Sequence, residues 1–243
     1  MSDGAFRPTR AMVLAAGLGK RMRPLTATTP KPLIEVARRS LIDYSFDRLV
    51  EAGVTEATVN VHYLADLVEV HVLRRPDLKV TISDERRQLL DTGGGIAAAL
   101  PTLGDEPFYL LNSDSFWLEG VRPNLSILAE GFDAERMDGL LLLATTVGSS
   151  GYDGRGDFLF DGRGMLTRRK PPAIAPFAYA GAAILHPRLF AGAPEGPFSL
   201  NVLFDRALEA GRLFGVRMEG TWLHVGTPAA IREAERTILA SAA

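Results

Sequence analysis

The chain has 243 residues, of which 47% are hydrophobic and 23% are charged, with a formal net charge of −2. These fractions match the soluble globular averages of about 45–50% and about 25%, which excludes a disordered chain, a collagen and a coiled coil. The absence of cysteine excludes a disulfide framework and a thiolate metal site.

Short β-rich runs alternate with helical patterns along the chain, which is typical of an α/β sheet. The continuous apolar run at 11–16 predicts a buried parallel strand. Ser40 followed by Asp43 predicts the beginning of a helix that Gly53 ends. Further strands are expected over 57–61, 79–83, 108–112, 139–146, 179–185 and 213–218, and further helices over 65–74, 94–100, 200–210 and 228–240.

One domain over 1–243, a mixed and mostly parallel sheet flanked by helices, is the predicted organisation, with a flexible N-terminus over 1–10. Residues 148–176 are dense in Gly, Pro and Arg, so we expect them to leave the sheet and cover or complete a site on the sugar side, with a hairpin at Asp161–Gly164. No apolar run reaches the roughly 18–20 residues of a membrane span, and residues 1–10 lack the apolar segment of a signal peptide. We therefore expect a cytoplasmic protein that contacts neither membrane nor nucleic acid, as a monomer or homodimer.

The loop after the first predicted strand is the most informative segment. Gly17 and Gly19 allow the backbone to approach a ligand and to point N–H groups at phosphate oxygens. Met22 stands where the dinucleotide fingerprint needs glycine, and the Walker pattern is absent. The alternative is an ordinary turn with solvated charges, but the surrounding cations and prolines favour phosphate binding: Lys20, Arg21, Arg23, Pro24, Pro30, Lys31 and Pro32.

A carboxylate, Asp114, directly follows the strand predicted over 108–112. In open α/β sheets ligands bind beyond the carboxyl ends of the strands, and Mg²⁺ is held by one or two carboxylates together with substrate phosphates. Asp114 is therefore a candidate metal ligand, with a turn residue as the alternative. The run Gly93-Gly94-Gly95 gives close backbone access where the next helix begins.

Several motifs together resemble the sugar-1-phosphate nucleotidylyltransferases. The longest is Gly17-Leu18-Gly19-Lys20-Arg21-Met22-Arg23-Pro24-Leu25-Thr26, followed by Pro30-Lys31-Pro32-Leu33. Later landmarks occur in the family's order: Asp91-Thr92-Gly93-Gly94-Gly95-Ile96, Asn112-Ser113-Asp114, Gly156-Asp157-Phe158, Tyr179-Ala180-Gly181 and Trp222-Leu223-His224-Val225-Gly226-Thr227-Pro228. Within the family the chain is most similar to the branch of uridylyltransferases that act on N-acetylmuramate 1-phosphate.

The resemblance implies a Rossmann-like nucleotidyltransferase fold and the transfer of uridylyl from UTP to a sugar 1-phosphate, with Mg²⁺ or Mn²⁺. It implies catalytic roles for Arg21, Lys31 and Asp114. It implies nucleotide contacts at Leu14, Ala16, Gly17, Gly19, Lys20, Arg21, Lys31, Gly93, Gly94 and Asn112, and sugar-phosphate contacts at Gly156, Asp157, Lys170, Tyr179 and Gly181.

Two departures from the family pattern carry separate expectations. Arg169 replaces a common Glu and is a candidate partner for the lactyl carboxylate of N-acetylmuramate, with a solvated charge as the alternative. His224 replaces a common metal-binding Asp, so it either ligates the metal, reaches it through water or has left the coordination shell. Two rival functions remain: a mannose- or heptose-1-phosphate guanylyl- or cytidylyltransferase, and a non-catalytic nucleotide-sugar sensor.

Overall fold

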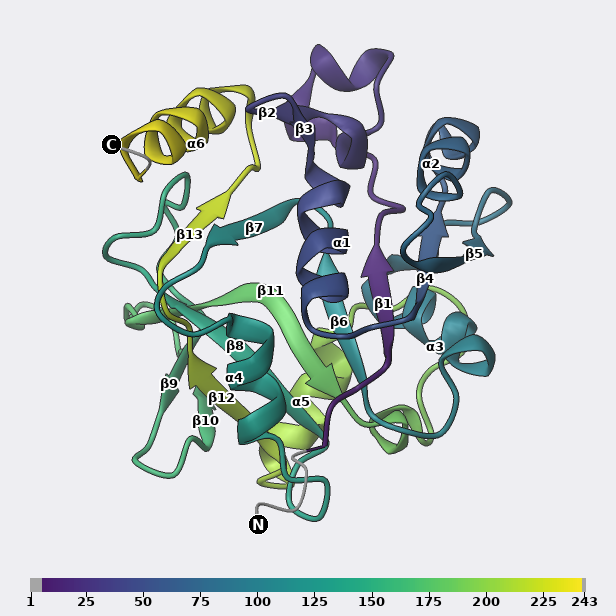
Figure 1. Ribbon diagram of the computed structural model, residues 1–243. Helices are drawn as coiled ribbons and strands as arrows, with labels where there is room; N and C mark the ends of the chain where they lie inside the picture. The colour runs from purple at the N-terminus through teal and green to yellow at the C-terminus, as the bar shows by residue number, and fades with distance from the viewer. Residues whose placement is uncertain (1–5, 242–243) are drawn as a thin grey trace.

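The computed structural model describes residues 6–241, which form a central sheet of nine strands flanked by helices (Figure 1). The strands of this sheet are β1 (Arg10–Leu14), β4 (Glu56–Val61), β5 (Lys79–Asp84), β6 (Phe108–Asn112), β8 (Gly139–Thr145), β9 (Phe158–Phe160), β10 (Leu166–Arg168), β11 (Phe177–Leu185) and β12 (Leu213–Arg217). Their order is β10-β9-β11-β6-β1-β4-β5, and β8 pairs with both β11 and β12. Strands β1, β4, β5 and β6 run parallel, whereas β11 is antiparallel to β6 and β8, so the predicted mixed and mostly parallel sheet is confirmed.

Helices cover both faces of the sheet. They are α1 (Leu41–Glu51), α2 (Ala65–Val72), α3 (Asp91–Leu103), α4 (Asn124–Gly131), α5 (Asn201–Glu209) and α6 (Pro228–Ser241). The core on one face joins α1, α2 and α4 to residues such as Ala11 and Val13, and the core on the other face joins α3 and α5 to Met12. Alternate residues of β1 are thus buried on opposite faces, which is why its sequence is continuously apolar. No helix in the described part of the chain is long and apolar enough to cross a membrane.

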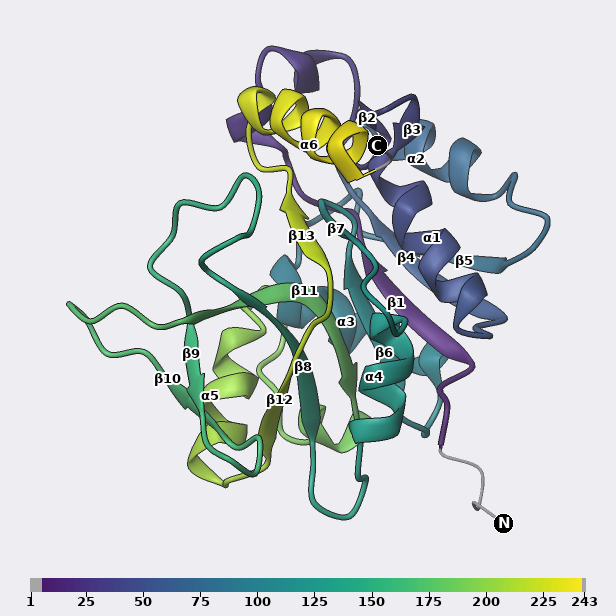
Figure 2. The same ribbon diagram turned by 60° about the vertical axis from the view of Figure 1, so that its left-hand side comes forward.

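Two small sheets and α6 form a third layer above the carboxyl edge of the central sheet. The pairs are β2 (Glu35–Val36) with β3 (Arg39–Ser40), and β7 (Ser115–Leu118) with β13 (Thr221–His224). Figures 1 and 2 show α6 beside β2 and β3, with β13 and β7 beneath it. A separate apolar cluster that includes Met22, Phe116 and Val225 holds this layer together.

Several boundaries differ from the sequence prediction for physical reasons. The first strand ends at Leu14, two residues early, because the Ala15 N–H leaves the ladder and donates to Asn60 Oδ1 at 2.8 Å. Helix α3 begins at Asp91, and α4, β7 and β13 are additional elements. Of the N-terminus expected to be flexible, residues 1–5 lie outside the described residues, whereas the Thr9 carbonyl accepts the N–H of Thr55 at 2.9 Å. The cap of α1 is as expected, since Ser40 accepts from the Asp43 N–H.

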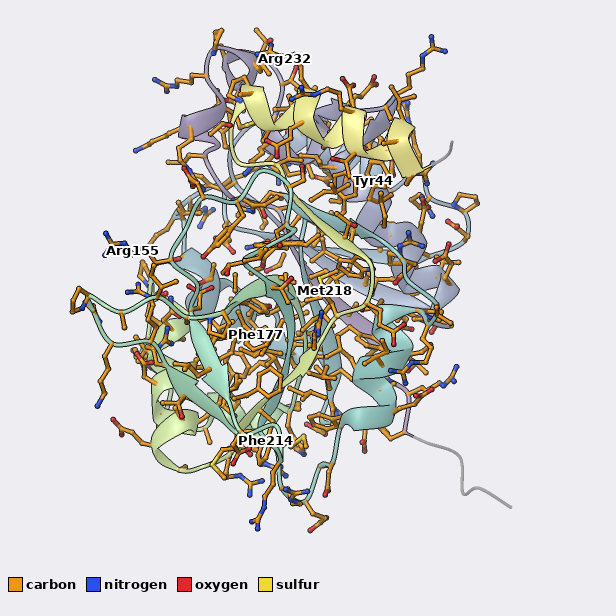
Figure 3. All side chains as sticks on the ribbon, turned by 90° about the vertical axis from the view of Figure 1, so that its left-hand side faces the viewer. Tyr44, Arg155, Phe177, Phe214, Met218 and Arg232 are labelled. Carbon is orange, nitrogen blue, oxygen red and sulfur yellow. The ribbon has the colours of Figure 1, made fainter. Side chains whose placement is uncertain are left out.

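The segment between β8 and β11 leaves the sheet and returns to it. Its strands β9 and β10 form the expected hairpin, and β9 pairs with β11 through Phe158 and Phe177. The Phe177 ring lies 4.7 Å from that of Phe160, inside this half of the molecule, while exposed Arg155 lies at the outer edge (Figure 3). Near its beginning the segment contacts the third layer, where Ser150 forms a β-bridge with Leu223 of β13. It is therefore anchored at both ends.

Candidate active site

A cavity of about 360 Å³ opens at the carboxyl ends of β1, β4 and β6. This is the edge of a parallel sheet where ligands bind, because loops diverge there and leave space. The lining combines apolar atoms with a few polar groups: Leu14, Ala15, Ala16, Gly17, Lys31, Pro32, Asn60, Leu89, Asp91, Thr92, Asn112, Ser113 and Asp114. Predicted residues Leu14, Ala16, Gly17, Lys31, Asn112 and Asp114 thus lie around one cavity.

A lysine–aspartate pair lies at one side of this cavity. Lys31 begins a short 3₁₀ helix, Lys31–Leu33, and its Nζ donates to Asp114 Oδ2 at 2.8 Å. Burial by itself would raise the pKa of Asp114, but the charge and hydrogen bond of Lys31 outweigh it and hold that pKa below its usual value. The carboxylate is therefore ionised at neutral pH. The side chain of Lys31 is only 11% exposed, so its position is fixed by packing as well as by this pair.

The glycine loop is held by its own side chains. Gly19 has a φ of +58°, and its carbonyl accepts from Thr26 Oγ1 at 2.9 Å. A Cβ at Gly19 would stand 2.8 Å from Thr26 Cγ2, so this close approach requires glycine. Lys20 and Arg21 are exposed on the same loop. Arg21 does not line the first cavity but a neighbouring one of about 550 Å³.

His224 lies in that second cavity, beside Asp114 rather than far from it. Strand β13 pairs with β7 so that His224 faces Ser115, and the Val225 N–H donates to the Asp114 carbonyl at 3.3 Å. The Nδ1 atom of His224 is buried without a hydrogen-bond partner. Burial lowers the pKa of His224; Asp114 opposes this effect, while Lys31 and Arg21 reinforce it. The imidazole is therefore neutral at neutral pH, and its buried Nδ1 has no hydrogen-bond partner among the described residues.

The three glycines of α3 serve packing. The N–H groups of Gly93 and Gly94 both donate to the Phe198 carbonyl, at 2.9 and 3.1 Å. A Cβ at Gly94 would stand 2.4 Å from the Gly196 carbonyl oxygen, and one at Gly93 would overlap the Phe198 ring. These two donors are thus occupied within the protein. Asp91 and Thr92, directly before them, line the cavity instead.

The predicted sugar-side residues lie on the segment after β8 and on β11. Asp157 has a structural partner, because its Oδ2 accepts the Tyr179 N–H at 2.9 Å. The Tyr179 hydroxyl is buried without a partner, and burial raises its pKa above the usual value. Gly181 lies at the irregularity of β11. A Cβ added at Gly181 would stand 3.2 Å from Asn112 Cβ. Lys170 is exposed, and Gly156 packs against Ala175.

The guanidinium of Arg169 bonds in part to its own segment. Its Nε donates to the Gly156 carbonyl at 2.8 Å, and its Nη1 donates to the Ala173 carbonyl at 3.2 Å. These bonds tie the two arms of the segment together. Arg169 therefore holds the backbone with two of its five N–H donors, and its role as a carboxylate partner stays a prediction.

The same segment contributes to the second cavity. Tyr152, Asp153 and Gly154 line it together with Arg21 and His224. The Tyr152 ring lies 6.2 Å from the His224 ring at a steep angle. None of these three was predicted, because their proximity to His224 depends on the bridge between Ser150 and Leu223, which pairs residues far apart in the chain.

The sheet, the cavity at its carboxyl edge and the cationic glycine loop are together typical of enzymes that bind nucleotides. The chain belongs to the nucleotidyl transferase family, whose model matches residues 10–146, and within it to the sugar-1-phosphate nucleotidyltransferases. It is 48% identical over 94% of its length to N-acetylmuramate alpha-1-phosphate uridylyltransferase of Caulobacter vibrioides, covering 96% of that protein. It is 34% identical over 93% of its length to the enzyme of the same name from Neisseria meningitidis serogroup B, again covering 96%.

A solved structure of low sequence identity shares the fold. The inositol-1-phosphate CTP transferase of T. maritima superposes with a TM-score of 0.76 at 19% identity, covering 97% of each chain. The predicted Rossmann-like nucleotidyltransferase fold and the predicted enzyme class are confirmed.

Proposed function

We propose that the protein transfers the uridylyl group of UTP to N-acetylmuramate α-1-phosphate. An oxygen of the sugar phosphate forms a bond to the α-phosphorus of UTP, and the bond from that phosphorus to the bridging oxygen of the β-phosphate breaks. The products are UDP-N-acetylmuramate and pyrophosphate. The observation that carries the proposal is the pair of buried Lys31 with partly exposed Asp114 beside the cavity, in a chain that is 48% identical to an enzyme of that name.

The reaction needs charge neutralisation rather than a general base, because the attacking phosphate oxygen is already ionised near neutral pH. Lys31 is placed to neutralise charge at the α-phosphate, since it lines the cavity and is held rigidly by packing. Arg21 is exposed on the glycine loop and lines the neighbouring cavity, and we assign it, with the backbone of that loop, to the β- and γ-phosphates. Asn112 and Thr92 line the part of the cavity available to the nucleoside.

A divalent cation fits the donor set beside Lys31. The Asp114 carboxylate is ionised, and neutral His224, whose Nδ1 has no partner, is close enough for the two groups to influence each other's pKa. No group of three or more His, Cys, Asp or Glu side chains that could hold a metal is found among the described residues, so substrate phosphates would complete the coordination. Mg²⁺ or Mn²⁺ held there would neutralise phosphate charge during transfer.

The test is pyrophosphate release measured for every pairing of UTP, GTP, CTP and dTTP with several sugar 1-phosphates. We expect the highest kcat/KM for UTP with N-acetylmuramate 1-phosphate. A higher value for GTP with mannose 1-phosphate, or for CTP with a heptose 1-phosphate, would leave only the enzyme class standing. Nucleotide-sugar binding without any pyrophosphate release would instead identify the sensor.

A further inference from the structure

Two buried polar side chains, one in the lining of the nucleotide cavity and the other bonded to it, belong to none of the family motifs identified in the sequence. Asn60 is on β4 and Glu85 directly follows β5, and each is only 2% exposed. Burying a carboxylate is costly unless hydrogen bonds compensate for the lost water. The bonds that compensate Glu85 lead to both walls of the cavity.

The hydrogen bonds form one chain with a fixed direction. The Ala15 N–H donates to Asn60 Oδ1 at 2.8 Å, which turns the Asn60 amide nitrogen toward Glu85. That nitrogen donates to Glu85 Oε1 at 2.7 Å, and the Leu90 N–H donates to Glu85 Oε2 at 2.9 Å. Since Ala15 and Leu90 offer only backbone donors here, both oxygens at position 85 must accept.

The two ends of this chain of bonds are the two walls of the cavity. Ala15 begins the turn that continues to Gly17 on one side. Leu90 precedes Asp91, which also lines the cavity and has a φ of +60°, a strained conformation for a residue other than glycine. Such a conformation persists only where the surroundings determine it, and the Glu85 bond fixes the residue immediately before it.

Helix α3 is shaped around the same pair. A Cβ at Gly95 would stand 2.6 Å from Glu85 Oε1 and 2.8 Å from the Asn60 amide nitrogen. The third glycine of the run is therefore required for the helix to pass over the two side chains. Asn60, Glu85 and Gly95 form a unit.

We infer that Asn60 and Glu85 are positioning residues for the nucleotide: they set the separation between the turn at Ala15–Gly17 and the corner at Asp91–Thr92, between which the nucleoside binds. This inference rests on the proposed function in one respect, that the cavity between these walls takes the nucleoside triphosphate. It does not depend on which base or sugar is used. Neither residue forms or breaks a bond in the reaction.

The direction of the hydrogen bonds makes a reciprocal exchange the sharpest test. Glu85→Gln places an amide where two donors converge, so one donor loses its acceptor. Asn60→Asp places a second carboxylate against the first. In the double variant Asn60→Asp/Glu85→Gln every bond is restored: the new carboxylate at position 60 accepts from Ala15 and from the new amide at position 85, whose oxygen accepts from Leu90.

We expect each single variant to raise the Kd for UTP with Mg²⁺, and the KM for UTP, by on the order of tenfold, as loss of one buried hydrogen bond allows. The KM for the sugar 1-phosphate should stay within about twofold of the wild-type value, because the variants alter only the walls of the nucleotide cavity. The double variant should recover most of the lost affinity for UTP. All measurements are made well below the unfolding midpoint of each variant, which is determined in parallel.

Asn124→Asp is the matched control. Asn124 is completely buried at the beginning of α4, where its amide nitrogen also donates to a carboxylate, that of Glu119, but it lies outside both cavities. This variant should lower the unfolding midpoint without changing the KM for UTP.

Two results would overturn the inference: single variants that lose stability but keep the wild-type affinity for UTP, or a double variant no better than the singles. If the wild-type protein prefers another nucleoside triphosphate, the uridylyl assignment fails, and the same three variants are measured with that nucleotide. If the wild-type protein binds no nucleoside triphosphate, the inference fails together with the proposed function.

Discussion

Lys31 and Asp114 neutralise each other at 2.8 Å before any substrate is bound. A bound triphosphate and cation would offer each of them a partner of higher charge. Lys31 would then share its charge with a phosphate from its packed position, and Asp114 would also face the metal. In the free protein the charge of each side chain is compensated by the other, and in the complex it would act on the substrate or the metal. This compensation explains why burying the lysine costs little free energy.

Removing the lysine should therefore affect turnover far more than stability. For Lys31→Ala we expect kcat to fall by a factor of about 10²–10³, the typical effect of losing one group that stabilises developing charge. We expect a similar fall in kcat for Arg21→Ala. The Asp114 side chain is 31% exposed and keeps access to water, so the unfolding midpoint should change little. Turnover is measured at saturating UTP and Mg²⁺, with Lys79→Ala, which removes an exposed lysine of β5 paired with Glu56, as the control. Near-wild-type turnover in both loop variants would contradict the assigned roles.

At His224 the expected readout is the identity of the preferred metal. Imidazole is a poor ligand for Mg²⁺ but suits Mn²⁺ and later first-row ions. His224→Asp should therefore shift the ratio of Mn²⁺ to Mg²⁺ affinity toward Mg²⁺, and the relative activities should shift with it. Free Mn²⁺ is counted by electron paramagnetic resonance in the presence of UTP, and Asp114→Asn shows the level expected without the site. An unchanged ratio would mean that His224 only packs beside Asp114.

Among the elements, α3 shows a packing role that its recognised glycine motif did not reveal. The glycine run suggested access to a ligand, whereas the N–H groups of Gly93 and Gly94 bond to Phe198, a residue far along the chain. That packing sets where the helix begins and hence where Asp91 and Thr92 stand. The effect of the glycines on the cavity is therefore indirect.

Adding one methyl group to this helix should destabilise the protein. A Cβ at Gly94 would stand 2.4 Å from a backbone carbonyl oxygen, which cannot move aside as a side chain can. We expect Gly94→Ala to lower the free energy of unfolding by about 1–3 kcal/mol. Gly162→Ala, in the hairpin of β9 and β10 with open space around it, should stay within about 0.5 kcal/mol. Urea unfolding measures both, and equal effects would refute the steric explanation.

Elements that depend on local pattern were predictable, and those that depend on distant pairing were not. The apolar run of β6 was predicted with its bounds, Phe108–Asn112. Strands β7 and β13 were missed because each has four residues and forms only by pairing with the other, with Trp222 opposite Trp117. Lys31 and Asp114 were recognised through motifs, whereas Asn60 lies in an apolar strand where nothing local marks it.

At the scale of the whole molecule, Asp138 joins separate segments of the chain at the edge of the sheet opposite the candidate active site. Its Oδ1 accepts from Arg188 Nε and from Arg212 Nε, which come from two other segments. Burial would raise the pKa of Asp138, but the two arginines outweigh it and hold that pKa below its usual value. The stability contributed by a carboxylate with a depressed pKa is present above its unfolded pKa and is lost as the pH falls through the folded pKa.

Asp138→Asn should accordingly lower the free energy of unfolding at pH 7 by about 2 kcal/mol, the value of hydrogen bonds to a charged group. The difference from wild type should begin to shrink as the pH approaches the unfolded pKa of Asp, about 3.9, and should be lost as the pH falls through the lower folded pKa. Urea unfolding across this pH range measures how the free energy of unfolding depends on pH. The control is Asp105→Asn, which changes an exposed aspartate. A difference independent of pH would assign the effect to packing.

The pairing of β7 with β13 also has a consequence for how the molecule forms. Trp222 Nε1 donates to Ser115 Oγ across 107 residues of chain, and such distant contacts are closed late because the loop entropy must be overcome first. Asp114 reaches the ribosome exit long before His224 does. During synthesis the cavity beyond β1, β4 and β6 can therefore take shape while His224 is still missing, and Asp114 gains this neighbour only when β13 docks against β7.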